Sequence, residues 1–123
     1  MGVYTRARVL RSLHFQGVKK IVYEKEKDIE AYFQSQVRRV LHGKSYKFIS
    51  PGNDGVPDRV AILPRKGREA LVRFVEMKRP GGVLRQIQVF RQAEMRMLGA
   101  VCDTLYSRED VDAWVAEMKK VLK

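Results

Sequence analysis

Three charged residues in the middle of the chain have the types and the spacing needed for metal-assisted chemistry. Asp58 follows Pro57 at the start of a β-rich run, and Glu76 and Lys78 lie near the end of the next apolar run. Side chains alternate along a strand, so Glu76 and Lys78 are expected to project from the same face. If the two runs pair as a hairpin, Asp58 approaches Glu76 at one edge of the sheet.

These groups suit the hydrolysis of a phosphodiester bond. Carboxylate oxygens are hard ligands, and two of them converging near a backbone carbonyl favour Mg²⁺. A bound metal polarises the phosphate and lowers the pKa of a bound water, while an ammonium stabilises developing negative charge. Lys78 is the candidate for the ammonium, and it could also orient the attacking water.

The alternative is that Glu76 and Lys78 form an ordinary surface pair and that Pro57 and Asp58 form an ordinary turn. Each match alone is common, because Pro-Asp and Glu-x-Lys are each expected by chance in roughly a third of chains of this length. Both together, in this order and with a hairpin between them, are expected in roughly a few per cent of chains. We therefore favour the catalytic interpretation.

Glu26 is a further candidate on a predicted helix. At helical spacing it projects into the apolar stripe that continues through Ile29 and Phe33, where a carboxylate needs a partner or a metal ion. It could equally sit at the first helical turn, where acids favour the helix dipole. Glu30 lies at the edge of the stripe and is a poorer candidate.

Gln88 is another polar residue on a helix face that is otherwise apolar. It could bridge Lys78 or a substrate phosphate, or it could be a core amide with its hydrogen bonds satisfied. His14 and His42 have no partner at ligand spacing and Cys102 lies on an apolar strand, so we expect all three to be structural.

The elements that must position these residues follow from the spacing of apolar residues and from Gly/Pro punctuation. Helices are predicted at residues 24–42 and 83–98, where Gly43 and Gly99 end them. A third helix is predicted after Ser107, which forms a capping box with Asp110. Strands are predicted at residues 46–49, at 58–63, which Pro64 closes, at 70–77 and at 101–106. A strand, a crossover helix and a strand in succession require a parallel pair. The order αβββαβα therefore predicts an α/β fold with a mixed central sheet flanked by helices.

The predicted strand at residues 70–77 is apolar on both sides except for Arg73 and Glu76. Strands of this kind are usually central in a sheet and covered on both faces. We therefore expect Glu76 to lie deep in the domain.

Composition points to a nucleic-acid partner. The 123 residues carry a formal net charge of +11 with a pI near 10.1, and a surplus of Lys and Arg favours binding to a polyphosphate through counterion release. A basic protein kept in solution by its charge is the alternative. No apolar run approaches the roughly 18 residues that cross a bilayer, so no membrane association is expected. A single cysteine, Cys102, excludes an intramolecular disulfide and favours a reducing cytoplasm.

The length allows one compact domain, which we place at residues 24–123. Residues 1–23 hold five of the 25 cations and no acids. They lack the continuous apolar core of a targeting peptide, so we interpret them as a basic N-terminal arm of the mature protein.

The joint pattern resembles a known family, the virus-type replication-repair nucleases (VRR-NUC), a branch of the PD-(D/E)xK nuclease superfamily. The resemblance rests on Gly55-Val56-Pro57-Asp58, Val75-Glu76-Met77-Lys78, Gly81-Gly82-Val83-Leu84 and Gln88, and it extends over about residues 24–110. It implies a restriction-endonuclease-like core with helices on both sides of the sheet. It also implies that short members act as homodimers on branched DNA.

For individual residues, the resemblance implies a Mg²⁺ or Mn²⁺ site at Asp58, Glu76 and the Met77 backbone carbonyl, with Lys78 catalytic. Glu26 would be an accessory acid and Gln88 a supporting polar residue.

Three classes of function stay open at this point. A structure-selective DNA nuclease is favoured over a sequence-specific restriction-like nuclease, because a short domain has few residues left to read base edges. It is also favoured over a basic binding module without chemistry, which would not need Glu76 and Lys78 on one strand face. A role on RNA receives little support, because the aromatic residues show no paired stacking pattern. For a dimer surface, Trp114 and the exposed side of the first helix are candidates.

Overall fold

The computed structural model describes residues 10–15 and 18–123, with side chains from residue 24 onward. The elements in chain order are β1 (Leu10–Phe15), β2 (Val18–Tyr23), α1 (Glu26–Leu41), β3 (Lys44–Lys47), β4 (Arg59–Arg65), β5 (Arg68–Met77), α2 (Gln86–Met97), β6 (Cys102–Leu105) and α3 (Arg108–Val121). From α1 onward this is the predicted order, and the α/β class is confirmed.

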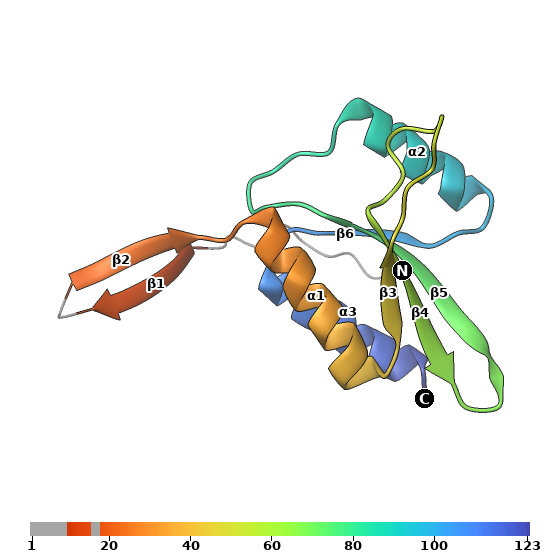
Figure 1. The fold of residues 1–123 in the computed structure, drawn as a ribbon, viewed down its shortest axis with the longest axis horizontal. Coiled ribbons are helices and arrows are strands. Elements are labelled where there is room, and N and C mark those ends of the chain that lie inside the picture. Colours follow the sequence, from red (N-terminus) through yellow and green to blue (C-terminus); the bar gives the residue numbers. More distant parts are fainter. Residues whose placement is uncertain (1–9, 16–17) are drawn as a thin grey trace.

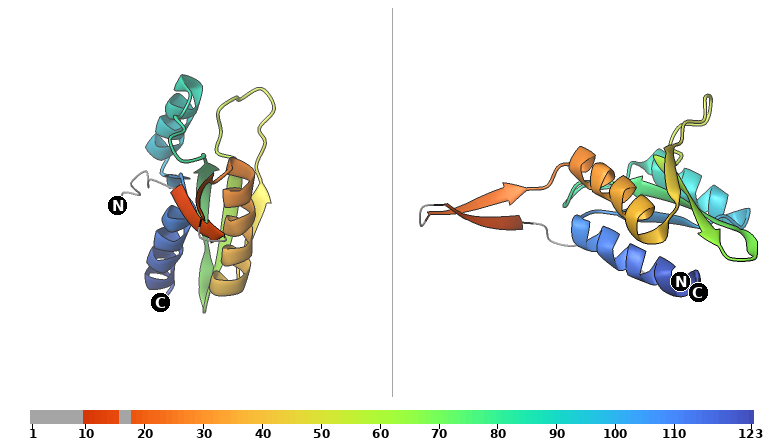
Figure 2. Two further views of the ribbon diagram at one scale, coloured as in Figure 1. Left: turned by 90° about the vertical axis from the view of Figure 1, so that its left-hand side faces the viewer. Right: turned by 60° about the horizontal axis from the view of Figure 1, so that its bottom comes forward.

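The main sheet has the strand order β3-β4-β5-β6. The β3–β4 and β4–β5 pairs are antiparallel, and the β5–β6 pair, joined by the crossover through α2, is parallel as expected. Figures 1 and 2 show α1 and α3 side by side against the sheet, with α2 separate from them and next to β6. The sheet is therefore mixed and has helices on both faces.

The apolar core lies between the sheet and the helix pair α1 and α3. It consists of residues from α1, from the strands and from α3: Ile29, Phe33, Val37, Leu41, Ala61, Leu63, Val75, Met77, Leu105, Val111, Trp114, Val115 and Met118. The Phe33 and Trp114 rings pack at its centre with a centroid distance of 5.0 Å. Trp114 is 0% exposed and its Nε1 donates to Asp103 Oδ2 at 3.0 Å. The expectation that Trp114 could form a dimer surface is therefore wrong.

The opposite face of the sheet is covered less completely than the sequence suggested. In β5 only the last three residues, Val75, Glu76 and Met77, are buried, and Val72 is 44% exposed. The reason is that α2 lies against β6 and leaves the neighbouring strands open. The prediction that β5 is covered on both faces is correct only at its carboxyl end.

The N-terminal boundary of α2 and the C-terminal boundary of β4 differ from the predictions. α2 begins at Gln86 instead of Val83, because the Arg85 backbone N–H donates to Gln88 Oε1 at 2.8 Å and so caps the helix at Arg85.

β4 continues through Pro64 to Arg65. Pro64 is exposed at an irregularity of the β4–β5 register, where its missing N–H leaves no ladder bond unmade.

The predicted strand at residues 46–49 is shifted toward the N-terminus, since β3 runs from Lys44. At the end of α1, His42 adopts the left-handed conformation with φ 57°, and the Gly43 N–H donates to Val37 O at 3.1 Å. Glycine is required at position 43 because a Cβ there would lie 2.4 Å from Ile62 O of β4. The helix thus turns into β3 within two residues.

Residues 10–15 and 18–23 of the predicted basic arm form an antiparallel two-stranded sheet, β1–β2, which extends away from the main sheet in Figure 1. Residues 1–9 and 16–17 lie outside the described residues, so the division into arm and domain stays a prediction. No described helix is long and apolar enough to cross a membrane.

Candidate active site

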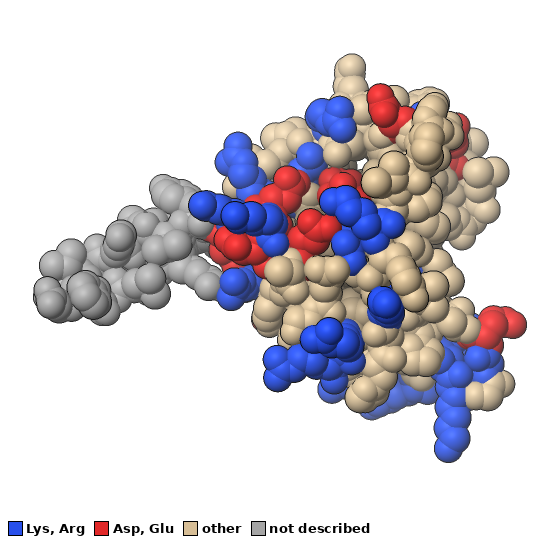
Figure 3. Space-filling model, viewed as in Figure 1, with Lys and Arg blue, Asp and Glu red and all other residues tan. Residues whose placement is uncertain are grey.

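Three carboxylates from three different parts of the chain converge at the carboxyl end of β5. Glu26 is the first residue of α1, Asp58 immediately precedes β4, and Glu76 is the penultimate residue of β5. One carboxylate oxygen from each lies within 4.8 Å of the other two. Figure 3 shows acidic side chains gathered over the N-terminal end of α1, with Lys and Arg side chains around them. The predicted approach of Asp58 to Glu76 is present.

Glu76 is the buried member of this acidic cluster, with 1% of its surface exposed. Its Oε2 accepts a hydrogen bond from Gln88 Nε2 at 3.3 Å, while its Oε1 has no hydrogen-bond partner among the described residues. The pKa of Glu76 is raised to about 9, first by burial, then by the side-chain hydrogen-bond contact and the negative charge of Asp58 and by the charge of Glu26, while Lys78 opposes the shift. Without a cation, this site therefore favours a protonated Glu76.

The donor set fits a divalent cation such as Mg²⁺. All three side chains offer oxygen only, and the buried Glu76 Oε1 lacks a donor among the residues that the structure describes. When all three groups are ionised, they repel one another at this separation, and a divalent cation relieves that repulsion.

Asp58 is held by a backbone hydrogen bond to the residue after β3 and by the close packing of the preceding loop on α2. Its carbonyl oxygen accepts from the Phe48 N–H at 2.7 Å, which ties it to the end of β3. The loop before it packs on the start of α2 so closely that a Cβ at Gly55, which has φ +90°, would lie 2.5 Å from Ile87 O. Only glycine fits at this position, which explains why the motif has glycine at residue 55.

Glu26 joins the site from the first turn of α1. The apolar stripe of α1 is buried from Ile29 onward, but Glu26 itself is exposed at the first turn. Of the two placements that the sequence left open for Glu26, the structure has the one at the helix start and not the one in the core. Its position at the helix start nevertheless brings its carboxylate to Asp58 and Glu76, because that end of α1 lies at the carboxyl end of β5.

Lys78 lies directly after β5, where its backbone N–H donates to Leu105 O of β6 at 2.9 Å. A cavity of about 220 Å³ next to the acidic cluster is lined by Glu26, Lys78, Arg79, Gly82 and Val83. A cation from Lys78 and one from Arg79 thus border the same polar cavity as an acid of the cluster. The arrangement can accommodate an anionic group beside a metal ion.

Gln88 contacts Glu76 rather than Lys78, the partner considered from the sequence. Its side-chain amide donates to Glu76 and its carbonyl oxygen accepts from the Arg85 N–H, so it is a buried amide with both ends bonded. It links the start of α2 to the carboxylate at the end of β5.

The sequence and the fold have counterparts among known proteins. The chain is 40% identical over 75 residues to a protein of Acyrthosiphon pisum secondary endosymbiont phage 1 named "Putative nuclease p44", an alignment that covers 61% of this chain and 75% of that protein. A solved structure of a VRR_NUC domain has a TM-score of 0.66 and 26% identity, covering 74% of this chain and 94% of that one. No family model matches the sequence.

The chain belongs to the virus-type replication-repair nuclease (VRR-NUC) family. It is therefore a nuclease, and the fold expected from the resemblance is confirmed. The roles of Asp58, Glu76, Lys78, Gln88, Glu26 and the Met77 carbonyl stay predictions.

Arg59 of this VRR-NUC domain was missed by the sequence reasoning, although it lies next to the motif aspartate. It is buried, and its guanidinium contacts Ser45 of β3 and Glu30 of α1. The signal was present in the alternation of β4, where Arg59 shares the inward face with Ala61 and Leu63. Glu30, ranked below Glu26, is thus part of a partly buried ion pair.

The residues expected to be structural in this nuclease are consistent with that interpretation where they are described. Cys102 is a buried free thiol, and burial raises its pKa. His42 ends α1. The side chain of His14 lies outside the described residues. The cytoplasmic location inferred from Cys102 stays a prediction.

Proposed function

We propose that this protein is a Mg²⁺-dependent endonuclease that cuts branched DNA, with four-way junctions as the preferred substrate. The observation that carries the proposal is the convergence of Glu26, Asp58 and Glu76 within 4.8 Å around a buried oxygen without a partner in the described part of the chain. Membership of a nuclease family and the net charge of +11 support a nucleic-acid substrate.

In this proposal Asp58, Glu76 and the Met77 backbone carbonyl hold the metal ion, with Glu26 as an accessory ligand. Mg²⁺ is the expected ion and Mn²⁺ the expected substitute. When bound, the ion supplies a Lewis acid for the phosphate and a lower pKa for water. Gln88 orients the Glu76 carboxylate through its 3.3 Å hydrogen bond.

Lys78 supplies the fixed positive charge of the site. Its place beside the cavity that Glu26 lines suits an ammonium that binds a phosphate oxygen and stabilises its increasing charge during the reaction. Arg79 borders the same cavity and is suited to a neighbouring phosphate of the backbone. Both contacts are made to phosphates, so they select the shape of the DNA and not its sequence.

A homodimer follows from the need to cut two strands. One acidic cluster of this kind is present in the described part of the chain, and a junction cut on two opposing strands needs two clusters at a fixed separation. Exposed apolar side chains on the outer side of α2, including Phe90, Met97 and Leu98, favour this helix as the place where a second copy packs. Light scattering at micromolar concentration should report twice the monomer mass. Met97→Glu should reduce the measured mass toward that of the monomer.

The test is cleavage of labelled four-way, flap, single-stranded and linear duplex DNA, and of RNA, in Mg²⁺, Mn²⁺ or chelator. The proposal predicts paired cuts in the four-way junction, slower cutting of linear duplex and none with chelator. Cutting of duplex at one sequence would support a restriction-like nuclease instead. Binding without any cleavage would support a basic binding module, and a preference for RNA would refute the DNA assignment.

A further inference from the structure

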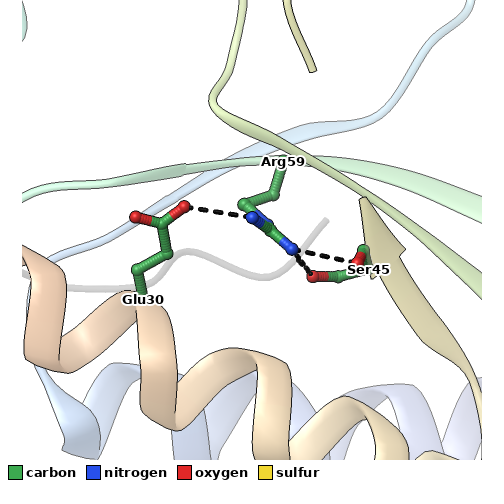
Figure 4. Close-up of polar contacts among 3 residues, drawn as sticks. All are labelled: Glu30, Ser45 and Arg59. Carbon is green, nitrogen blue, oxygen red and sulfur yellow. Dashed lines mark hydrogen bonds and ion pairs between the residues drawn. The ribbon is translucent and has the colours of Figure 1, made fainter. Parts of the chain in front are cut away.

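A buried guanidinium connects three of the elements that surround the acidic cluster. Arg59 Nη2 donates to Ser45 Oγ and to Ser45 O, both at 2.9 Å, and Nε donates to Ser45 Oγ at 3.1 Å. On the other side, Nη1 forms an ion pair with Glu30 Oε2 at 3.3 Å. Figure 4 shows Arg59 between the other two residues. We call Glu30, Ser45 and Arg59 the Arg59 bridge.

The bridge lies next to two cluster residues in the chain. Asp58 directly precedes Arg59, so the contact between Arg59 and Ser45 fixes the backbone from which the Asp58 side chain extends. Glu30 is one helical turn after Glu26, so both lie on the same face of α1. The ion pair between Arg59 and Glu30 therefore connects the turn of α1 after Glu26 to the strand that follows Asp58.

The start of α1 has no side-chain cap of its own. The N-cap residue Lys25 makes no side-chain capping hydrogen bond, so the first turn, which carries Glu26, is held by the contact of Glu24 with Arg108 before it and by the Arg59 bridge after it. Glu26 is also repelled by the carboxylate of Asp58 at a separation of 4.8 Å or less. Fraying of this turn would move Glu26 away from the cluster.

The ion pair is sufficiently enclosed to oppose this repulsion. The side chain of Arg59 is 6% exposed and that of Glu30 is 23% exposed, so solvent screens their attraction less than it screens a surface pair. The guanidinium also contacts both partners at once, which a lysine ammonium with a single nitrogen does not reproduce.

We propose that the Arg59 bridge positions Glu26 against Asp58 and Glu76, so that an intact bridge sets the affinity of the acidic cluster for a divalent cation. Arg59 and Glu30 are then positioning residues of the nuclease. This inference rests on the proposed metal-dependent function.

The test measures Mn²⁺ binding to the full chain without DNA, by titration calorimetry and by the decrease of the free-ion signal in electron paramagnetic resonance. Glu30→Gln is the principal variant, because it removes the ion pair at a partly exposed residue and leaves the core intact. We expect the Mn²⁺ dissociation constant to rise about 10-fold, as for other residues that orient metal ligands. Arg59→Lys should also weaken binding.

The matched control is Glu94→Gln. It removes another arginine ion pair, the 2.8 Å contact with Arg91 on α2, which is outside the cluster. Its Mn²⁺ dissociation constant should equal that of the wild type. In cleavage assays, Glu30→Gln should need more metal for half-maximal rate but recover kcat at saturating metal, a split that a general loss of folded protein does not produce.

A double-mutant cycle separates positioning from a simple effect of charge. In a Glu26→Gln background, Glu30→Gln should not weaken Mn²⁺ binding further, because the residue that the bridge positions is no longer a ligand. The same 10-fold weakening in that background, or an unchanged dissociation constant in Glu30→Gln alone, would overturn the proposal. If the wild type binds no Mn²⁺ and Glu76→Gln is identical to it, the proposed function itself fails.

Discussion

The two faces of the main sheet are covered by different kinds of side chain. The face toward α1 and α3 is apolar and closed, with the Phe33–Trp114 contact at its centre. On the other face α2 presents two buried amides, Gln88 and Gln92, toward the sheet, and Gln88 contacts Glu76. Adjacent residues of β5 thus belong to different environments, with Met77 in the core and Glu76 in the acidic cluster.

This difference suggests that the two faces of β5 have separate roles. Side chains that point to one face stabilise the fold, and side chains that point to the other take part in the chemistry. A buried carboxylate without a full set of partners lowers stability, and it is retained where a cation or a reaction needs it. Changes on the apolar face should therefore act on folding, and changes at the cluster should act on catalysis while leaving folding intact or improved.

The largest expected effect is the loss of cleavage when a cluster residue is removed. Glu76→Ala, Asp58→Ala and Lys78→Ala should each lower kcat by about 10³-fold or more, since each removes a group that stabilises charge in the reaction. Binding of non-cleavable DNA should persist, because the rest of the basic surface is intact. Wild-type rates in Glu76→Ala would show that the site is assigned incorrectly; circular dichroism checks that each variant folds.

The next effect is on folding and concerns the opposite face. Trp114→Ala should lower the free energy of unfolding by about 3–5 kcal/mol, because it leaves a large cavity against Phe33 and leaves Asp103 without its indole donor. Urea titration measures the change. Cleavage by the fraction that remains folded should continue, and a decrease of kcat at full folding would show that the two faces are not independent.

A third prediction concerns pH. Without metal, the pKa of Glu76 is about 9 in the folded chain against an ordinary value of 4.5. Between these values the folded state holds a proton that the unfolded state lacks, so the free energy of unfolding should fall as pH rises. Glu76→Gln should flatten this slope and raise stability at pH 8 by at least about 1 kcal/mol. Urea titrations in chelator from pH 5 to 9 measure the free energy of unfolding of the wild type and of Glu76→Gln. The same pH dependence in both proteins would show that burial does not raise the pKa of Glu76.

The smallest effect concerns the basic arm. Removal of residues 1–20 takes away five cations. If these residues bind DNA, the slope of log affinity against log salt should become less steep by about 0.9 for each phosphate that the shortened protein no longer neutralises. Titration of labelled duplex at several salt concentrations in chelator gives the slope. An unchanged slope would indicate a role for the arm in folding or dimerisation.

Much of the fold followed from local sequence signals. The strand predicted at residues 70–77 is present within β5, and Gly99 and Ser107 marked an end and a start of helices that the structure confirms. The approach of Asp58 to Glu76 could be predicted because a hairpin between two adjacent strands brings them to one edge of the sheet. These features depend on neighbours in the chain or on a single strand pair.

What could not be predicted depends on how distant elements pack. Glu26 is in the cluster because of where α1 begins relative to β5, and its helical phase alone suggested a core position that it does not occupy. Arg59 required knowledge that β3 and α1 both lie within reach of its side chain. The Gln88–Glu76 contact likewise required the placement of α2.

The central claim is that Glu26, Asp58 and Glu76 form a divalent-cation site, and Mn²⁺ titration of the DNA-free protein tests it most directly. The account predicts saturable binding by the wild type, at least about 10-fold weaker binding by Glu76→Gln, and release of a proton at neutral pH because the ion displaces it from Glu76. Equal affinity of the wild type and Glu76→Gln, without proton release, would contradict it.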